Sequence, residues 1–531
     1  MIKRNLYLIQ VFATCISLLL SVHLWAETHD IVISNGRVID PESGLDAIRY
    51  VGITGNRITS ISKRKLRGRQ EIDATGLVVA PGFIDAHVHG QTQFGSKLML
   101  RDGVTTTLDM EVGGLNTNAW YAQRRGQWQT NYGITVSHEL VRMSILDGLE
   151  LAGPIDAQHI GPTRLAAEKR DGTPHYALSI PTNDQLNAIA QRVDEELRQG
   201  ALGLGSTIGY MIKGVTTEEM WELQSAAARY GRGSYSHVRL LGSSKPPTEG
   251  TLGLAEGLAN ALALNAPFMA MHDNNHGWWE NEAKLAAARN QGFNVWSEYY
   301  PYISGSGPIG SEFLRPATLI EDWGLSYEDA MMDPATGEFY SQASYQQKRA
   351  ADPGYMVVLF FRQREAWLPQ WLTRQHAAVG SDAMPTTDKE GKDLVWDSPY
   401  EDFVGHPRTA GSHAKVLRLG REHGVPLMQT LKQLSYWSAL HLGDAGIKAM
   451  RERGRLQKGM IADITVFNPQ TVTDQAVHKL GAQGKPSTGI PYVLVSGQLV
   501  VKASRVLAVF SGQPVRYDEL TTGRHQPIAI H

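Results

Sequence analysis

Cysteine is almost absent from this chain: Cys15 is the only one among 531 residues. It lies in an N-terminal segment that we expect to be removed, so the mature protein holds no thiol. This excludes disulfide bonds, a cysteine nucleophile and thiolate metal ligands. Any metal ion must then be bound by histidine, aspartate or glutamate.

A strong net charge is absent as well. The chain carries 51 lysines and arginines against 53 acidic residues, which gives a net charge of −2. This balance gives no indication of a nucleic-acid partner or of an anionic membrane surface. A G-x-S-x-G motif before a helix is also missing, which disfavours a Ser-His-Asp hydrolase. We therefore expect a small-molecule substrate and leave a homo-oligomer open.

The first 26 residues have the pattern of a secretory signal. Lys3 and Arg4 precede an apolar run from Leu6 to Leu20, and the small residue Ala26 follows. A basic start, a short apolar core and a small residue are typical of a cleaved signal peptide. We predict secretion or export to the periplasm, with no membrane contact after cleavage. Because the cleavage site is imperfect, an uncleaved membrane anchor is the alternative.

Both ends of the remaining chain contain short strand-like stretches with glycine turns. These stretches are residues 30–40 and 50–61 near the start, and 462–467 and 492–500 near the end. Short strands joined by such turns are typical of small β domains. We predict that residues 27–80 and 456–531 pair into one β-sandwich domain, and that residues 81–455 fold as a separate unit.

The middle of the chain alternates strand-like and helix-like segments. Eight candidate strands lie near residues 78–85, 104–111, 133–138, 201–207, 234–238, 267–272, 294–298 and 376–382. Strands that alternate with helices favour a parallel sheet, and eight of them predict an α/β fold of the (β/α)8 or TIM-barrel type. Residues 303–375 are too many for a simple connection. We predict a lid over the catalytic face, with packing at the side as the alternative.

The most informative stretch is residues 81–90, where an apolar run ends in His87 and His89. Side chains alternate along a strand, so both imidazoles lie on the same side. Two neighbouring imidazoles at a strand end can share one metal ion of the zinc type. An isolated H-x-H pair is also compatible with two hydrogen-bonded structural histidines. Whether the pair binds metal therefore depends on which other residues lie near it.

Further polar residues end four other candidate strands: Glu111, His237, His272 and Asp382. Because barrel enzymes place catalytic groups at the carboxyl ends of strands, we expect these side chains to meet His87 and His89. Four histidines and two carboxylates are the donors of a hydrolytic site with one or two divalent metal ions such as zinc. All six residues are therefore predicted metal ligands.

The roles follow from charge. Two metal ions repel each other, so an anionic ligand is needed between them, and Glu111 is our prediction for this bridge. A carboxylated Lys213 is the competing bridge. Asp382 would accept a proton from the metal-activated water and later pass it to the leaving nitrogen.

Several segments carry a family resemblance. They are residues 81–90, 103–106, 200–207, 236–239, 300–302, 380–382, 406–408 and 453–463. In them the chain resembles the amidohydrolase superfamily and, more narrowly, the N-acyl-D-amino-acid deacylases (D-aminoacylases). The resemblance covers almost all of the mature chain. It implies a metal-dependent barrel, a β-sandwich from both chain ends, a lid and the hydrolysis of amide bonds.

The resemblance also suggests substrate-binding residues. Arg408 matches an arginine that binds the substrate carboxylate in this family, and a guanidinium suits a carboxylate. Tyr300 matches a tyrosine that lines the same pocket. For Arg239 and His138 we expect substrate binding, with structural roles as the alternative.

Two positions depart from the family pattern. A lysine that the family uses for the substrate carboxylate is replaced by Asn274. A cysteine ligand near the end of the second strand is replaced by the sequence Asp109-Met110-Glu111-Val112.

We therefore predict a hydrolase that cleaves the linear amide bond of an N-acyl amino acid, of D configuration, or of a dipeptide-like compound. The first alternative is a cyclic-amide hydrolase of the dihydroorotase or hydantoinase kind, which needs the Lys213 bridge. The second is a barrel without catalysis that serves as a binding module.

Overall fold

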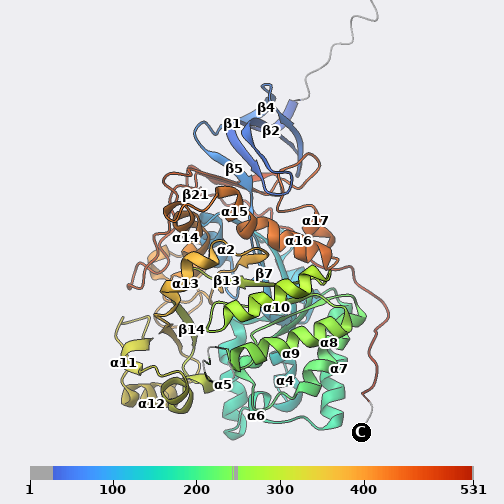
Figure 1. Cartoon of the computed structure of the whole chain (residues 1–531), viewed down its shortest axis with the longest axis vertical. Coiled ribbons are helices and arrows are strands. Elements are labelled where there is room, and N and C mark those ends of the chain that lie inside the picture. Colours follow the sequence, from blue (N-terminus) through green and yellow to red (C-terminus); the bar gives the residue numbers. More distant parts are fainter. Residues whose placement is uncertain (1–27, 242, 244, 246–248, 529–531) are drawn as a thin grey trace, which may run out of the picture.

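A computed structural model describes residues 28–528, apart from positions 242, 244 and 246–248. The predicted signal segment, residues 1–26, lies outside the described residues. In the part of the chain that is described, no helix has the length and hydropathy needed to cross a membrane. Figure 1 shows a barrel flanked by helices, with a small sheet domain at one end of the molecule.

Eight parallel strands form the barrel. They are β6 (Phe83–Asp85), β7 (Val104–Leu115), β8 (Asn131–Ser137), β10 (Gly203–Ser206), β11 (Gly233–Ser236), β12 (Phe268–Ala270), β13 (Val295–Tyr299) and β17 (Ala377–Val379). Each pairs in parallel with the next in this order. A parallel bridge between Val88 and Ala383 brings the first and last strands together. The predicted (β/α)8 barrel is thereby confirmed.

Helices connect the barrel strands and surround them. They are α2 (Gln93–Arg101), α3 (Thr117–Arg124), α4 (His138–Leu146), α5 (Ile160–Asp171), α6 (His175–Leu178), α7 (Asn183–Arg198), α8 (Thr217–Arg229), α9 (Glu249–Leu264), α10 (Trp278–Asn290), α13 (Arg364–Trp371), α14 (Arg408–Glu422), α15 (Leu427–Leu431), α16 (Trp437–Asp444) and α17 (Lys448–Arg451). Helix α7 shows why the sequence folds this way. Thr182 and Gln185 form a capping box at its start, and Leu186, Ile189, Val193 and Leu197 are buried on one face.

Apolar side chains fill the barrel below its catalytic end. The cluster includes Leu108, Met110, Tyr235, Met269 and Trp296 from four different strands, all fully or almost fully buried. Close packing at this level leaves the polar strand ends above it as the place where chemistry can occur.

Strands from both ends of the chain form the small sheet domain. Its N-terminal strands are blue in Figure 1. Its strands are β1 (Thr28–Asp40), β2 (Leu45–Thr54), β3 (Arg57–Ser62), β4 (Arg67–Asp73), β5 (Val78–Pro81), β18 (Ile464–Phe467), β19 (Tyr492–Val495), β20 (Gln498–Lys502) and β21 (Arg505–Val506). The two groups join where β5 pairs antiparallel with β18. The expectation that both chain ends build this domain agrees with this pairing.

The stretch that we predicted as one strand, residues 78–85, is two strands. Its first half is β5 of the small domain and its second half is β6 of the barrel. Gly82 separates them, and a Cβ at this position would lie 2.3 Å from Thr105 Oγ1. The chain therefore crosses from one domain to the other at a residue that must lack a side chain.

The end of the chain differs from its expected place in the sandwich. After β21 it returns to the barrel, where Val515 N donates to Tyr132 O (2.8 Å) and Tyr517 N donates to Gly200 O (3.1 Å). The side chain of Val515 is completely buried in the barrel cluster. Residues 512–517 thus pack against the barrel rather than extend the small sheet.

Residues 303–375 form a unit with its own core between β13 and β17. Strands β14 (Ser304–Pro308), β15 (Met331–Met332) and β16 (Met356–Phe360) make an antiparallel sheet in the order β14-β16-β15. Helices α11 (Tyr327–Ala330) and α12 (Gln342–Ala351) belong to the same unit, and the rings of Tyr327 and Tyr345 stack with centroids 4.4 Å apart. We call residues 303–375 the insertion.

Candidate metal centre

The six predicted metal ligands meet at one end of the barrel, and all six are buried. His87 and His89 follow β6, Glu111 lies in β7, His237 follows β11, and His272 and Asp382 come shortly after β12 and β17. Their donor atoms form two groups, in each of which all atoms lie within 4.8 Å of one another. The first holds His87, His89, Glu111 and Asp382, and the second Glu111, His237 and His272. Parallel strands thus bring together residues that are far apart in the sequence.

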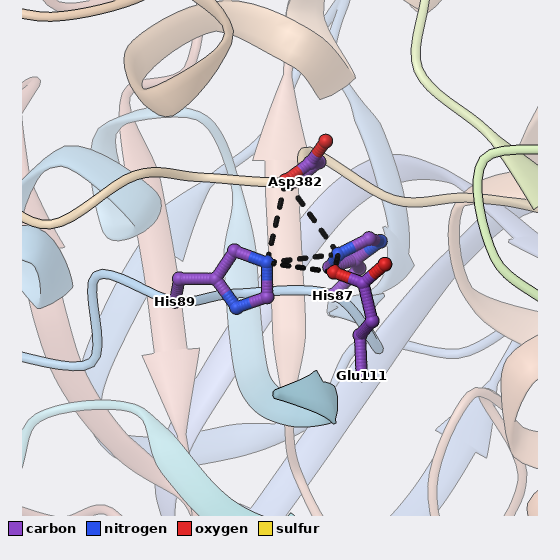
Figure 2. A group of neighbouring side chains, drawn as sticks. All are labelled: His87, His89, Glu111 and Asp382. Carbon is purple, nitrogen blue, oxygen red and sulfur yellow. Dashed lines mark hydrogen bonds and ion pairs between the residues drawn. The ribbon is translucent and has the colours of Figure 1, made fainter. Parts of the chain in front are cut away.

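Glu111 belongs to both groups because its two oxygens point in different directions. Its Oε2 lies 3.0 Å from His87 Nε2 and 3.2 Å from His89 Nε2 (Figure 2). Its Oε1 lies 3.0 Å from His237 Nδ1 and 3.0 Å from His272 Nε2. This is the geometry of a carboxylate between two cation sites.

The donor set fits a divalent metal ion. His87 Nε2 and His89 Nε2 lie 3.0 Å apart, and both lie 3.4–3.5 Å from Asp382 Oδ1. Tetrahedral ligands at about 2.1 Å from a zinc ion stand roughly 3.4 Å from each other, which is close to these separations. Four imidazoles and two carboxylates are nitrogen and oxygen donors of the kind that zinc accepts.

The charges of the site favour a bound cation. Burial lowers the pKa of His87, but the carboxylates of Glu298, Asp382 and Glu111 outweigh burial and raise it well above its ordinary value. Burial raises the pKa of Asp382, but Arg408 and His87 outweigh burial and hold it well below its usual range. Asp382 is therefore ionised, and the negative potential that attracts protons to His87 also attracts a metal ion.

Two further carboxylates orient the first histidine pair. Asp109 Oδ2 lies 3.1 Å from His89 Nδ1, and Glu298 Oε1 lies 2.8 Å from His87 Nδ1. When Nδ1 donates to a carboxylate, Nε2 keeps its lone pair and faces the centre of the site. The sequence reasoning gave Glu298 no role, although it ends a predicted strand as the metal ligands do.

The backbone is strained at two of the six residues. His272 has a φ of 32° and Asp382 a φ of 50°, in the left-handed region that residues other than glycine seldom adopt. Such conformations persist where the surrounding structure enforces them and are common at functional sites.

Two cavities open from the donor cluster. The larger has a volume of about 370 Å³, and its lining includes the donors His89, Glu111 and Asp382 as well as Leu165, Tyr355 and Met384. The smaller, of about 60 Å³, is lined by His237, His272 and Asp382 together with Asn275, Tyr300 and Arg364. The insertion contributes walls to both cavities, so it lies over the catalytic end of the barrel, as expected of a lid.

Three expected site residues lie elsewhere. Lys213 Nζ pairs with Glu312 at 2.9 Å, and its side chain is 58% exposed, so it does not reach Glu111. Arg239 forms a two-pronged ion pair with Glu256. These two residues fix local structure.

His138 is also a structural residue. It is fully buried, and both of its ring nitrogens are engaged, by Ser206 Oγ and by Glu219, each at 2.9 Å. The hydrogen-bonding groups of this strand-end histidine are thus satisfied within the fold, which agrees with the structural role that we gave as the alternative.

Arg408 and Tyr300 do lie at the site. Arg408 Nη2 is 2.9 Å from Asp382 Oδ2, and its guanidinium lies over the Tyr300 ring at 4.8 Å. Arg364 contacts the same tyrosine and donates to its hydroxyl at 2.9 Å. The sequence gave no signal for Arg364, because the insertion has no strand pattern that places its residues.

Comparison with known proteins adds a family context. No protein-family model matches the chain. The N-acyl-D-glutamate deacylase of Alcaligenes xylosoxydans xylosoxydans is 27% identical over 497 residues, which cover 89% of this chain and 93% of the relative. The D-aminoacylase of the same organism is 23% identical and covers 94% of this chain and 97% of the relative.

A solved structure shares the fold over nearly the whole chain. It is an N-acyl-D-glutamate deacylase from Bordetella bronchiseptica complexed with zinc and a phosphonate inhibitor, with a TM-score of 0.72 and 22% identity. The match covers 92% of this chain and 100% of that chain. In its barrel and along almost its whole length, the chain is thus similar to proteins of the D-aminoacylase-like branch of the amidohydrolases.

Proposed function

We propose that this protein is a metal-dependent hydrolase that cleaves the amide bond of an N-acyl amino acid, with a preference for the D configuration. The observation that carries the proposal is the buried donor cluster around Glu111, which opens into a cavity large enough for a small substrate. The relatives that match the chain from end to end, an N-acyl-D-glutamate deacylase and a D-aminoacylase, support the substrate class.

Each group of donors would hold one divalent ion, zinc by analogy with the related structure. His87, His89 and Asp382 surround the first position, His237 and His272 the second, and Glu111 lies between them. When bound, the metal supplies Lewis acidity, which polarises a carbonyl and eases the deprotonation of water. One ion at the first position or two ions at both are compatible with these donors.

Asp382 is the proposed general base and acid. Its Oδ1 faces His87 and His89 while its Oδ2 is bound by Arg408. In the reaction, water oxygen bonds to the amide carbon, the carbon–nitrogen bond breaks, and Asp382 transfers the proton from the water to the leaving nitrogen. A carboxylic acid and a free amine are the products. Because Arg408 keeps Asp382 ionised, the base is ready before substrate binds.

The alternatives have less support. A cyclic-amide hydrolase would need Lys213 as the bridging ligand, and Lys213 is paired with Glu312 at the surface. A binding module without catalysis has no need of six buried donors held by further carboxylates and a strained backbone. Linear amide hydrolysis is the function that gives a role to each of the six metal donors.

We also propose that the protein is exported and that residues 1–26 are removed. The support is the basic start, the apolar run and the lack of cysteine in the rest of the chain. Expression with the native N-terminus in a bacterial host, followed by fractionation and mass measurement, tests this. A cytoplasmic protein that keeps its first residues would contradict it.

The function is tested by a hydrolysis screen of N-acyl-D and N-acyl-L amino acids and dipeptides with protein loaded with zinc. We expect release of free amine from N-acyl-D substrates and one or two bound metal ions by elemental analysis. An absence of turnover with every N-acyl amino acid, in protein that holds its metal, would overturn the proposal.

A further inference from the structure

We infer that Arg364, which the insertion contributes, binds the α-carboxylate of the substrate and sets the requirement for an acidic substrate. The inference rests on the proposed function. The Arg364 side chain is buried, and among the described residues no carboxylate forms an ion pair with it. Its Nη1 donates to Tyr300 Oη at 2.9 Å, its Nη2 donates to Asn275 Oδ1, and its Nε has no partner.

A second buried arginine lies beside it with unused donors. Arg408 Nη2 forms an ion pair with Asp382, but Nε and Nη1 of Arg408 have no hydrogen-bond partner. The two guanidinium carbons lie 5.4 Å and 4.8 Å from the centre of the Tyr300 ring. Two buried cations thus face one buried carboxylate in this region, Asp382. Buried N–H donors without acceptors are unfavourable, and a buried positive charge favours an anion.

The space beside these groups is open. Gly305 lines the smaller cavity, and a Cβ there would lie 3.1 Å from Tyr300 Oη and 3.9 Å from Arg408 Nη1. Tyr300 therefore borders the same volume that Arg364 lines, and the Arg408 guanidinium lies next to the Gly305 wall of that volume. A guanidinium offers parallel N–H groups that match the two oxygens of a carboxylate.

The position of this volume identifies which carboxylate it takes. The smaller cavity is lined by His237, His272 and Asp382 as well as by Arg364, so it adjoins the metal donors directly. In an N-acyl amino acid only the amide nitrogen and Cα separate the α-carboxylate from the scissile carbon. Because the donors and Arg364 line one small cavity, their arrangement suits that spacing, while the acyl group would extend into the larger cavity.

Arg364 also accounts for the departure at position 274. The family pattern places a lysine there for the substrate carboxylate, whereas Asn274 Nδ2 here donates to the carbonyl of Tyr300 at 3.2 Å. The positive charge for the carboxylate would then come from the insertion and not from the loop after β12. The insertion would then recognise the substrate as well as cover it.

The test compares two substrates that differ only in charge: the best N-acyl amino acid from the screen and the matching N-acyl amino alcohol, in which CH2OH replaces the carboxylate. Wild-type protein should prefer the acid. In Arg364→Met, kcat/KM for the acid should fall about 10- to 100-fold, mainly through KM, while the alcohol changes less than about threefold, because one charge-assisted contact is lost. For Arg364→Lys, kcat/KM for the acid should lie between the values of wild type and Arg364→Met.

A matched control and a second variant complete the design. Arg362, two residues away in the insertion and exposed, gives Arg362→Met, which should behave like wild type. Asn275→Asp places a carboxylate next to Arg364 in an isosteric side chain, so it should remove the preference for the acid without removing the arginine. This variant keeps the test valid if Arg364→Met does not fold.

Equal losses for the acid and the alcohol in Arg364→Met and in Asn275→Asp would overturn the inference and leave Arg364 as a structural anchor. An unchanged preference for the acid in both variants would overturn it as well. A wild-type protein without activity on any N-acyl amino acid would instead contradict the proposed function, so the two failures are distinguishable.

Discussion

His87 Nε2 and His89 Nε2 face each other across 3.0 Å, and both contact the same oxygen of Glu111. Two imidazole nitrogens at this distance repel each other unless a proton or a metal ion lies between them. The carboxylates of Asp109 and Glu298 hold the rings from behind, so the pair cannot relax by rotation. Metal occupancy should therefore affect the stability of the barrel as well as catalysis.

Removal of the metal should destabilise the protein. A ligand that binds only the folded state at a free concentration a thousandfold above its Kd stabilises that state by about 4 kcal/mol. We expect chelation to lower the melting temperature in calorimetry and zinc to restore it. A melting temperature that is the same with and without chelator, in protein whose metal loss is verified, would contradict a metal bound within the fold.

Substitution of Asp382 should remove turnover and leave the other donors in place. In Asp382→Asn we expect kcat to fall about 10²- to 10⁴-fold, because proton transfer is lost. His87, His89 and Glu111 should still retain metal, which elemental analysis can check. Asp397→Asn, at an exposed position, is the control. A kcat within a factor of about three of wild type would remove Asp382 from the chemistry.

Glu298 should act through His87. Glu298→Gln weakens the hydrogen bond to His87 Nδ1, so metal affinity should fall about 10- to 100-fold. Activity should largely return when the variant is saturated with zinc, since Glu298 does not face the cavity. Titration with a fluorescent zinc indicator gives the affinity, and Glu321→Gln, at an exposed position, is the control. An unchanged zinc affinity would show that the orientation of His87 does not depend on Glu298.

A histidine network at the root of the insertion should make the protein sensitive to acid. Arg408 N donates to His406 Nδ1 at 3.0 Å, so His406 Nε2 donates to Ser304 Oγ at 2.8 Å. Ser304 then donates to His478 Nε2 at 2.9 Å, which requires a neutral His478. Burial, with Lys415 and Arg408 nearby, lowers the pKa of His478 to about 4.

The direction of the pH effect follows from that shift. Because the unfolded state binds a proton on this histidine at higher pH than the folded state does, stability falls as pH decreases from about 6.5 towards 4, by at most about 3 kcal/mol. His478→Gln keeps an acceptor for Ser304 and does not titrate, so its stability should fall less over this range in urea denaturation. His423→Gln, at an exposed position, should follow wild type. Identical profiles of stability against pH for His478→Gln and wild type would exclude the histidine network as the source of the acid sensitivity.

The strand ends explain how much of this site was predictable. His87, Glu111, His237, His272 and Asp382 each follow or end a strand, and the barrel topology then brings them together without further information. The same rule would have selected Glu298, which ends a strand too. It also selected His138, because a sequence does not reveal that Ser206 and Glu219 already satisfy that ring.

Other features depend on tertiary contacts that leave no periodic signal. Residues 78–85 have the apolar character of one continuous strand, and only the approach of Thr105 to Gly82 divides them between two sheets. Arg364 begins helix α13 within the insertion, and no strand-end pattern placed it near Tyr300. The return of Val515 to the barrel follows a stretch without regular structure.

The pairing of β5 with β18 joins Pro81 to Ile464 and has a consequence for biosynthesis. During translation the first strands leave the ribosome long before their partner exists, and β5 then presents an open hydrogen-bonding edge. Such edges promote association between chains. A slow step late in folding, when the last strands dock, should therefore limit the yield of native protein, and truncation before β18 should produce aggregates rather than a smaller folded enzyme.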